Sequence, residues 1–283
     1  MQRAAPLVET GLVAALTELV ARAGAAILAL GRAELAARTK PDQSPVTAAD
    51  AAAEAVLLDG LARILPGVPV ISEESAESLR LSSDALRPAF LSVDPLDGTR
   101  ELLEGRDEYT VNVALVVDGL PLLGVIGAPA RNLLWRGGQG RGAERLRLAP
   151  RGGIVGEARA IRARRWPERD PVATVSRSHL DPGTSELLER FPRLRRRARG
   201  SALKFCELAE GAADIYPRLA PTSEWDVAAG HALLVAAGGT IVTPAGAPLL
   251  HGRAEQSFRV PAFIALADPA AVSAVTSVVS AKN

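Results

Sequence analysis

The sequence predicts an α/β protein, and three observations support this class. Apolar residues recur every three or four positions between residues 12 and 30, which is typical of a long helix with one buried face. Asp118-Gly119 separates two β-rich segments and favours the backbone angles of a tight hairpin. After residue 171, strand-like and helix-like segments alternate. With 283 residues, the chain is long enough for one large or two small domains.

In the amino-terminal half, the periodic segment at residues 12–30 predicts the first helix. A second helix is expected to start at Thr47, whose hydroxyl can cap it, with Asp50 three residues later at its positive end. The strands predicted next cover residues 68–72, 90–93, 109–117 and 120–126. The first two of these strands run directly into acidic residues, and the last two make the sheet at least partly antiparallel.

In the carboxyl-terminal half, the predicted elements are a strand at 171–176, a helix at 201–210, a strand at 214–216 and a helix at 225–237. Gly211 ends the first of these helices, and Gly238 and Gly239 end the second. The Gly- and Arg-rich stretch between residues 150 and 171 indicates a connection or an edge region. We therefore expect an α+β metal-binding domain over residues 1–165. An α/β domain over residues 166–283 would supply Asp226 and the nucleotide contacts.

Composition excludes several classes of function. The 33 Lys and Arg residues against 32 Asp and Glu leave a formal charge of +1, too balanced for a dedicated nucleic-acid binder. The single cysteine excludes an internal disulfide and a cysteine-based zinc site. No secretion signal is evident, and charges and prolines interrupt the apolar tracts before they reach the roughly 20 residues that a bilayer requires. We expect a cytoplasmic protein without an integral membrane segment. Peripheral association with the inner face of the membrane and the oligomeric state stay open.

The most informative segment is Asp94-Pro95-Leu96-Asp97-Gly98-Thr99. Pro95 discourages a regular strand or helix there, so the two aspartates can converge across a turn. Oxygen ligands at this spacing suit Mg²⁺, with the carbonyl of Leu96 as a further ligand. Gly98 permits close approach of the chain, and Thr99 with the following amides could hold a phosphate. Taken alone, the hexapeptide is equally compatible with an Asp-rich surface turn.

Three further acids, Asp50, Glu73 and Asp226, lie at the ends of predicted elements. Each alone would be read as a solvated charge or a helix cap. Two carboxylates about 4 Å apart repel by roughly 4 kcal/mol at an effective dielectric of about 20, so five of them beside a phosphate require cations. A metal pair can activate water and clamp the attacking and leaving oxygens, which makes a side-chain nucleophile unnecessary. The set therefore predicts phosphate-ester hydrolysis with two or three Mg²⁺ ions.

The same residues resemble the signature of the Mg²⁺-dependent, lithium-sensitive phosphatases of the inositol monophosphatase and fructose bisphosphatase superfamily. The matching blocks are Pro45–Asp50, Ser72–Glu74, Asp94–Thr99 and Trp225–Gly230. The resemblance implies a layered α-β-α-β-α sandwich with mixed sheets. Within the superfamily, the chain is similar to the CysQ-type 3′(2′),5′-bisphosphate nucleotidases. The blocks that carry this closer likeness are Ser176–His179, Gly200–Cys206, Ala209–Gly211 and Tyr216–Arg218.

The resemblance also implies roles for individual residues. The ligands of two metal ions would be Glu73, Asp94, the carbonyl of Leu96, Asp97 and Asp226, with Asp94 shared by both ions. Asp50 and Thr99 would orient or activate the attacking water, with a third, loosely held ion as an option. The amides of Gly98 and Thr99 would receive the phosphate. The nucleotide side would be lined by His179, Ser201, Lys204 and Arg218, of which the last two carry charges suited to a second phosphate.

The activity that the resemblance implies is hydrolysis of the 3′-phosphate of adenosine 3′,5′-bisphosphate (PAP) to AMP and phosphate, extending to conversion of 3′-phosphoadenosine 5′-phosphosulfate (PAPS) to adenosine 5′-phosphosulfate (APS). An inositol monophosphatase or a sugar bisphosphatase with the same metals is the nearest alternative. A non-catalytic nucleotide sensor is an alternative of another class. The arginine run between Arg193 and Arg199 is interpreted as a solvated or structural face, with contact to nucleic acid or an anionic membrane as the alternative.

Overall fold

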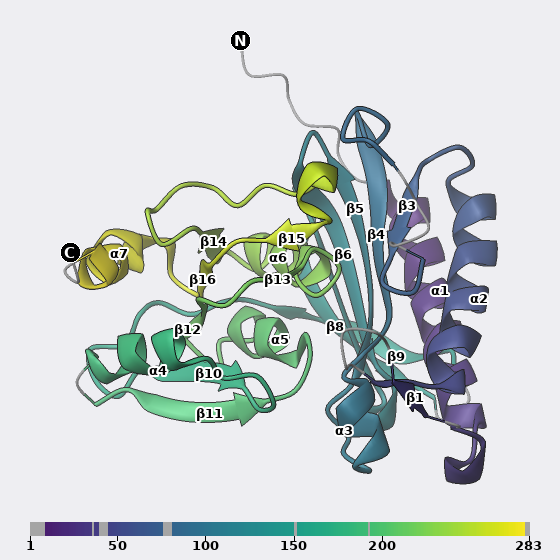
Figure 1. The fold of residues 1–283 in the computed structure, drawn as a ribbon, viewed down its shortest axis with the longest axis horizontal. Helices are drawn as coiled ribbons and strands as arrows, with labels where there is room; N and C mark the ends of the chain where they lie inside the picture. The colour runs from purple at the N-terminus through teal and green to yellow at the C-terminus, as the bar shows by residue number, and fades with distance from the viewer. Residues whose placement is uncertain are drawn as a thin grey trace.

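The computed structural model describes residues 9–35, 37–39, 45–75, 81–149, 152–191 and 193–280. Its elements stack in five layers in the order helices, sheet, helices, sheet, helices (Figure 1). The first layer is the pair α1 (Thr10–Ala29) and α2 (Ala48–Ile64), which lie on one face of the larger sheet. The layered α-β-α-β-α architecture with mixed sheets is thus confirmed.

The larger sheet has seven strands in the order β3-β4-β5-β6-β7-β8-β9. Their bounds are β3 (Val70–Ser72), β4 (Ala89–Asp97), β5 (Thr110–Val117), β6 (Leu120–Ala128), β7 (Leu133–Gly138), β8 (Gly142–Leu148) and β9 (Ile154–Ile161). Only β3 and β4 are parallel, and the other neighbours are antiparallel. Asp118 and Gly119 take φ angles of 49° and 78°, which confirms the predicted tight turn between β5 and β6.

The smaller sheet has five strands in the order β11-β10-β12-β16-β14 and is also mixed. Its strands are β10 (Val172–Ser176), β11 (Arg195–Arg199), β12 (Ile215–Arg218), β14 (Thr240–Val242) and β16 (Phe263–Leu266). The remaining short strands pair as β1 (Arg38–Thr39) with β2 (Pro45–Val46) and as β13 (Thr222–Ser223) with β15 (Arg259–Val260). Helices α5 (Leu203–Ala209) and α6 (Ala228–Ala236) lie between the two sheets (Figure 1).

The other helices lie outside this central layer. They are α3 (Thr99–Leu103), α4 (Pro182–Glu189) and α7 (Val272–Ser280), with 3-10 turns η1 (Arg32–Glu34), η2 (Pro129–Arg131), η3 (Ala254–Gln256) and η4 (Pro269–Ala271). Helices α4 and α7 close the fold beyond the smaller sheet, whereas α3 directly follows β4 (Figure 1).

Three apolar clusters hold the layers together. The first joins α1 and α2 to the outer face of the larger sheet, as Leu16 and Leu57 pack with strand residues. The second fills the space between the sheets and includes Phe205 of α5, and the third joins α4 and α7 to the smaller sheet through residues such as Leu188 and Val275. Because burial of apolar surface is the main force that favours folding, each layer is stabilised by its neighbours.

Helix α1 is long and apolar enough to cross a membrane by length and composition. In the structure, 50% of its apolar window is buried within the protein, where α1 packs against α2 and the strands β5 and β6. Of the part of the chain that the structure describes, it is the one helix that meets this test. The expectation that no tract is long enough was therefore too strict, although α1 serves as a core helix here.

Strand β4 departs from the prediction at Pro95. The strand continues through Pro95 to Asp97 instead of ending at residue 93, and its register against β5 shifts between Asp94 and Asp97. A bulge of this kind accommodates the missing proline amide and re-aims the side chains on either side. The expectation that Pro95 discourages a regular strand is met by this irregularity, although the strand itself continues, and the irregularity lies where the two aspartates converge.

Two helices begin later than predicted. Ser201 has a φ of 50°, which lies outside the helical region, so α5 starts at Leu203. Helix α6 starts at Ala228 because the preceding residues form a turn that Asp226 closes by accepting the amide hydrogen of Ser223 at 3.0 Å. Ser201 and Asp226, two residues of the predicted site, therefore lie in the loop just before a helix.

The predicted division between residues 165 and 166 falls in the connection from β9 to β10, where the chain passes from one sheet to the other. The predicted edge region contains β9, the last strand of the larger sheet. The central apolar cluster includes Trp135 and Phe205, which come from opposite sides of this division. The two-domain description therefore stays a prediction.

A pair of buried histidines joins α6 to the loop after β14. Nδ1 of His231 lies 3.1 Å from Nε2 of His251. Burial lowers the pKa of His231 to about 4, and burial together with the charges of His231 and Arg253 lowers the pKa of His251 well below its ordinary value. Both rings are therefore neutral at pH 7, and one accepts the hydrogen of the other.

We expect the ring resonances of His231 and His251 to show no titration between pH 8 and pH 5 in an NMR experiment. The unfolded chain protonates these rings near pH 6.5, so this pair contributes stability above that pH and loses it as pH falls toward 4. For His231 alone the loss is roughly 3 kcal/mol at pH 4. The variant His179→Gln contains only these two histidines, so the ring signals that remain in its spectrum belong to them. A midpoint near 6.5 for either ring would contradict the prediction.

Candidate metal centre

The five predicted acids come from four parts of the fold. Asp94 and Asp97 lie at the end of β4, and Asp50 lies in the first turn of α2. Glu73 follows β3, and Asp226 lies in the turn between β13 and α6. One carboxylate oxygen from each of Asp94, Asp97 and Asp226 lies within 4.8 Å of the others. The structure thus brings together residues that are separated by more than 100 positions in the sequence.

Asp94 lies at the centre of this group and is fully buried. Its Oδ1 accepts the amide hydrogen of Leu96 at 3.1 Å, whereas Oδ2 has no hydrogen-bond partner among the described residues. Burial raises the pKa of Asp94 well above its ordinary value, and the negative charges of Glu73 and Asp97 raise it further. A buried carboxylate oxygen without a partner is costly, so this atom requires a cation or a proton.

The other two carboxylates of the cluster, Asp97 and Asp226, have partners that offset part of their negative charge. Burial and the charge of Asp226 raise the pKa of Asp97 to about 7, against the opposing charge of Lys204. Asn112 donates a long hydrogen bond of 3.4 Å to Oδ2 of Asp97. Asp226 accepts hydrogen bonds from the hydroxyl of Thr222 and the amide of Ser223, both at Oδ2. Three clustered carboxylates, one with an unpartnered buried oxygen, fit a hard divalent cation.

Asp50 and Thr99 form a separate pair beside these carboxylates. The amide and the hydroxyl of Thr47 donate to Oδ2 of Asp50 at 2.7 and 2.8 Å, which confirms the predicted capping box of α2. The hydroxyl of Thr99 lies 3.1 Å from Oδ1 of Asp50 and 3.3 Å from the carbonyl oxygen of Leu96. Burial raises the pKa of Asp50 despite the hydrogen bonds from Thr47, which makes this carboxylate a better base.

Glu73 is held by a residue that the sequence prediction missed. Oε1 of Glu54 accepts hydrogen bonds from the hydroxyls of Ser72 at 2.6 Å and Ser75 at 2.9 Å, which fixes both ends of the turn that carries Glu73. The amide of Glu73 donates to the carbonyl oxygen of Val93 at 3.3 Å. Glu54 lies one helical turn after Asp50 on α2, and this spacing is the signal that could have identified it.

The residues predicted for the nucleotide side lie next to the acids. Lys204 is buried, its ammonium group donates to the carbonyl oxygen of Ser201, and Nζ lies 5.3 Å from the centroid of the Tyr216 ring. Nε of Arg218 is buried without a hydrogen-bond partner in the described ranges. The charges of Asp226 and Asp97 act on Arg218, and that of Lys204 acts on Asp97. A cationic region therefore borders the acidic one.

His179 adds to this region from the end of β10. Burial lowers its pKa, and so do the positive charges of Arg100, Arg218 and Lys204. Arg100 was not predicted, although it directly follows Thr99 in the sequence. The neutral ring of His179 thus lies among three cations, in surroundings that favour an anionic ligand.

Similarity to known proteins is extensive. The profile described as the inositol monophosphatase family matches residues 9–274. This chain belongs to the inositol monophosphatase family. It is 39% identical over 248 residues to the 3′(2′),5′-bisphosphate nucleotidase CysQ of Escherichia coli K12, covering 87% of this chain and 96% of that protein. Inositol monophosphatases are metal-dependent phosphatases, in agreement with the carboxylate cluster.

Solved structures of the inositol monophosphatase family share the fold. The CysQ structure from Bacteroides thetaiotaomicron superimposes with a TM-score of 0.75 at 32% identity and covers 91% of this chain and 97% of that one. The inositol monophosphatase of Anabaena gives a TM-score of 0.72 at 26% identity, with 96% of each chain covered. The predicted family and fold are therefore both confirmed.

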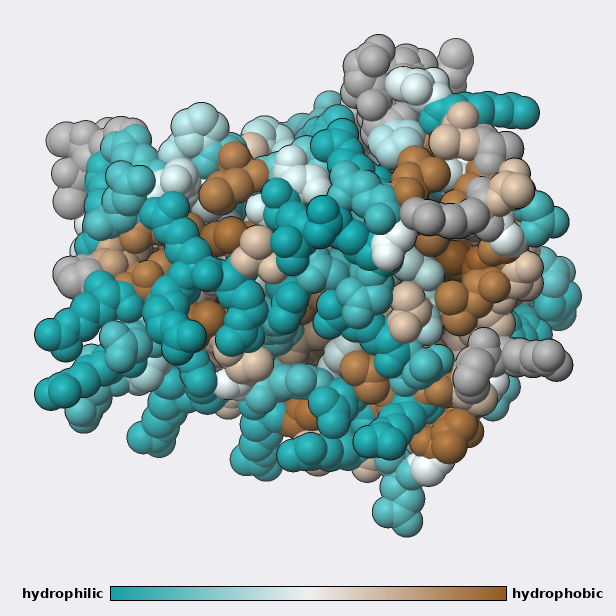
Figure 2. All heavy atoms as spheres, turned by 90° about the horizontal axis from the view of Figure 1, so that it is seen from below, coloured by the Kyte–Doolittle hydropathy of each residue, from teal (hydrophilic) through white to brown (hydrophobic). Residues whose placement is uncertain are grey.

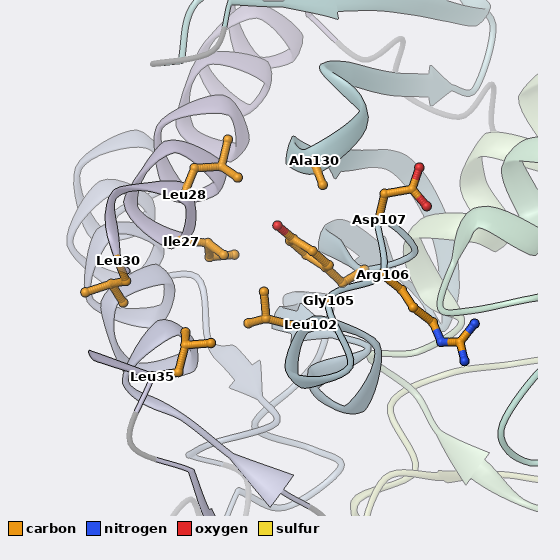
Figure 3. A pocket seen from close by; sticks show the side chains of 10 residues that line it. Ile27, Leu28, Leu30, Leu35, Leu102, Gly105, Arg106, Asp107 and Ala130 are labelled. Carbon is orange, nitrogen blue, oxygen red and sulfur yellow. The ribbon is translucent and has the colours of Figure 1, made fainter. Parts of the chain in front are cut away.

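A cavity of about 280 Å³ lies between α1 and α3, and none of the five predicted acids lines it. Figure 3 shows Ile27, Leu28 and Leu102 around it, while the guanidinium of Arg106 points away. Its lining is largely apolar, with Arg106, Asp107 and Tyr109 as the polar exceptions. The substrate site is therefore better assigned to the region between the acids and the cations.

Asp97→Asn should stabilise the metal-free protein at pH 8, to a smaller extent at pH 5 and not at all below about pH 3.8. The pKa of Asp97 is raised to about 7, so its ionisation costs stability as pH rises from 3.8 through 7. In EDTA at pH 8 we expect the melting temperature of the variant to rise by about 2–4 °C. Added MgCl₂ should raise the melting temperature of the wild type and much less that of the variant.

The control for this melting experiment is Asp84→Asn, a substitution at an exposed aspartate away from the cluster. It should leave both the metal-free stability and the response to MgCl₂ as in the wild type. If Asp97→Asn lowered the melting temperature in EDTA at pH 8, the repulsion described above would not exist.

Proposed function

We propose that this chain is a Mg²⁺-dependent 3′(2′),5′-bisphosphate nucleotidase that hydrolyses the 3′-phosphate of PAP to AMP and phosphate. The observation that carries the proposal is the position of two cations, the buried Lys204 and the half-buried Arg218, beside the carboxylate cluster. A substrate with two phosphates can place one at the metal ions and the other at these cations. The names of the similar CysQ proteins from Escherichia coli and Bacteroides thetaiotaomicron support the same activity.

The proposed metal ligands are Glu73, Asp94, the carbonyl of Leu96, Asp97 and Asp226. Two Mg²⁺ ions, with Asp94 shared between them, would balance the charge of the cluster, and a third is an option. When bound, Mg²⁺ supplies positive charge that favours ionised water and stabilises the leaving oxygen. All these protein ligands are oxygen atoms, the donors that Mg²⁺ prefers.

The proposed role of Thr99 and Asp50 is to position the attacking water and take its proton. Asp50 is fixed by Thr47, so its Oδ1 is held toward the hydroxyl of Thr99. As the attacking water loses a proton to the hydroxyl oxygen of Thr99, the hydroxyl hydrogen of Thr99 would pass to Oδ1 of Asp50, so the proton ends on that carboxylate. The amides of Gly98 and Thr99 are proposed to receive the phosphate, and Gly98 with a φ of 97° lets the chain turn closely there.

On the nucleotide side, His179, Ser201, Lys204 and Arg218 are proposed to contact the substrate. The unpartnered Nε of Arg218 is a donor that a phosphate oxygen would satisfy. Lys204 adds a charge without a rigid geometry. The proposal extends to PAPS as a second substrate, to inhibition by lithium and to a cytoplasmic location.

A panel of substrates should separate the proposal from its alternatives. We expect PAP to be hydrolysed with a kcat/KM at least about tenfold above those of inositol 1-phosphate and fructose 1,6-bisphosphate, a difference of about 1.4 kcal/mol in transition-state binding. EDTA should abolish phosphate release, and MgCl₂ should restore it. A preference for inositol 1-phosphate or the sugar bisphosphate would replace the proposed substrate, and tight binding of PAP without turnover would indicate a sensor.

Thr99→Val should reduce kcat for PAP by about 10²-fold or more, because it removes the hydroxyl that links water to Asp50. The rise in melting temperature on addition of MgCl₂ should persist, since Thr99 contributes no proposed metal ligand. Thr240→Val on β14 is the matched control, and it should retain wild-type kcat. Wild-type kcat for Thr99→Val would rule out its role with the water.

A further inference from the structure

Glu108, in the loop between α3 and β5, connects the metal-binding residues to the nucleotide side. Its buried carboxylate accepts hydrogen bonds from Nε and Nη2 of Arg177 at 2.8 and 2.9 Å. It also accepts Nη1 of Arg199 at 3.0 Å and the amide of Gly200 at 2.8 Å. One carboxylate thus holds the ends of both β10 and β11, the two strands that lead to the proposed nucleotide contacts.

The three bonds from Arg177 and Arg199 join two charged groups and are strong, and the fourth comes from the neutral amide of Gly200. Although burial opposes ionisation, the hydrogen bonds from Arg177 and Gly200 lower the pKa of Glu108 to about 2. The carboxylate is therefore ionised throughout the pH range in which the protein would be assayed. Charge-assisted and paired bonds of this kind hold a fixed geometry better than neutral ones.

The surrounding contacts tighten the same connection. A Cβ atom on Gly200 would lie 2.6 Å from the carbonyl oxygen of Glu108, so only glycine allows this approach. The hydroxyl of Ser201 lies 2.8 Å from that of Thr110, the first residue of β5. The hydroxyl of Ser178 donates to Glu101 on α3 at 2.6 Å. The segments 177–179 and 200–204 are therefore both fixed to residues 101–110, which follow the phosphate-binding residues Gly98 and Thr99.

The arginine run explains why the loss of Glu108 would leave the fold intact. Arg199 has a second partner, because its Nε donates to Glu207 at 2.5 Å, and Arg197 lies 3.6 Å from the same carboxylate. Arg196 bonds to Ser185 of α4. Strand β11 therefore stays attached to α4 and α5 without Glu108. What would be lost is its alignment with the metal-binding residues.

We propose that Glu108 is a positioning residue that sets the preference for a bisphosphate over a simple phosphate ester. By holding the segments 177–179 and 200–204 in register with the end of β4, it fixes the distance between the site of the reacting phosphate and Lys204, one of the two cations proposed to bind the other phosphate. Glu108 itself touches no reacting atom. This inference rests on the proposed nucleotidase function.

The test compares Glu108→Gln with the wild type on PAP and on 4-nitrophenyl phosphate, which carries no second phosphate. We expect KM for PAP to rise about tenfold with kcat within about twofold, and both constants for 4-nitrophenyl phosphate to stay within about twofold. Arg177→Met removes two of the four hydrogen bonds, so its KM for PAP should rise by a smaller factor. In the double variant with Glu108→Gln, the two increases in KM should not multiply, because both substitutions act on the same bonds. Glu104→Gln, at an exposed glutamate of the same loop that pairs with Arg106, is the matched control and should behave as wild type.

AMP keeps only the phosphate that is proposed to bind on the cation side. Calorimetric titration with AMP therefore measures the affinity of that side without turnover. Its affinity should fall about tenfold in Glu108→Gln. An equal loss of kcat/KM on PAP and 4-nitrophenyl phosphate, or unchanged AMP affinity, would overturn the positioning role. If wild-type protein fails to hydrolyse PAP but Glu108→Gln still weakens AMP binding, the nucleotidase function fails and the positioning role stands. Absence of AMP binding by the wild type overturns both.

Discussion

The mutual repulsion of clustered carboxylates is the constraint on which the rest of this structure depends. One carboxylate oxygen from each of Asp94, Asp97 and Asp226 lies within 4.8 Å of the others, and burial raises the pKa of Asp94 and of Asp97. The protein compensates only partly, through single hydrogen bonds from an amide, a hydroxyl or Asn112. The remaining repulsion favours binding of a divalent cation, because a divalent charge offsets more of it than a monovalent charge does.

Around this cluster, local backbone irregularities and hydrogen bonds orient the acidic side chains. The bulge at Pro95 turns β4 so that Asp94 and Asp97 face the same region, and the capping box of α2 fixes Asp50. Glu54 clamps the turn that presents Glu73. The capping box also satisfies the backbone amide of Thr47, whereas the hydrogen bonds of Glu54 join side chains only.

Local signals in the sequence were sufficient for much of the fold. Thr47 with Asp50 predicted the cap of α2, and Asp118-Gly119 predicted the turn between β5 and β6, because both depend on neighbouring residues only. The site acids could be identified as a set from motif resemblance. Their convergence was a prediction that depended on the fold as a whole.

The features that were missed depend on contacts across the chain. Glu108 meets Arg177 and Arg199 only after β10 and β11 have paired, and His231 meets His251 only after the loop that follows β14 has closed. Nothing in the sequence around Glu108 distinguishes it from the exposed acids beside it. The start of α5 was also placed too early, because Ser201 has a positive φ and its hydroxyl contacts Thr110 of β5, and the local sequence reveals neither.

The position of α6 between the two sheets has a consequence for how the protein matures. Asp226 lies just before this helix, 132 positions after Asp94, so the carboxylate cluster joins segments that are distant in the sequence. Contacts of large sequence separation slow folding. A chain in which α6 has not yet packed between the sheets would lack one carboxylate of the cluster, and we expect it to bind a cation more weakly.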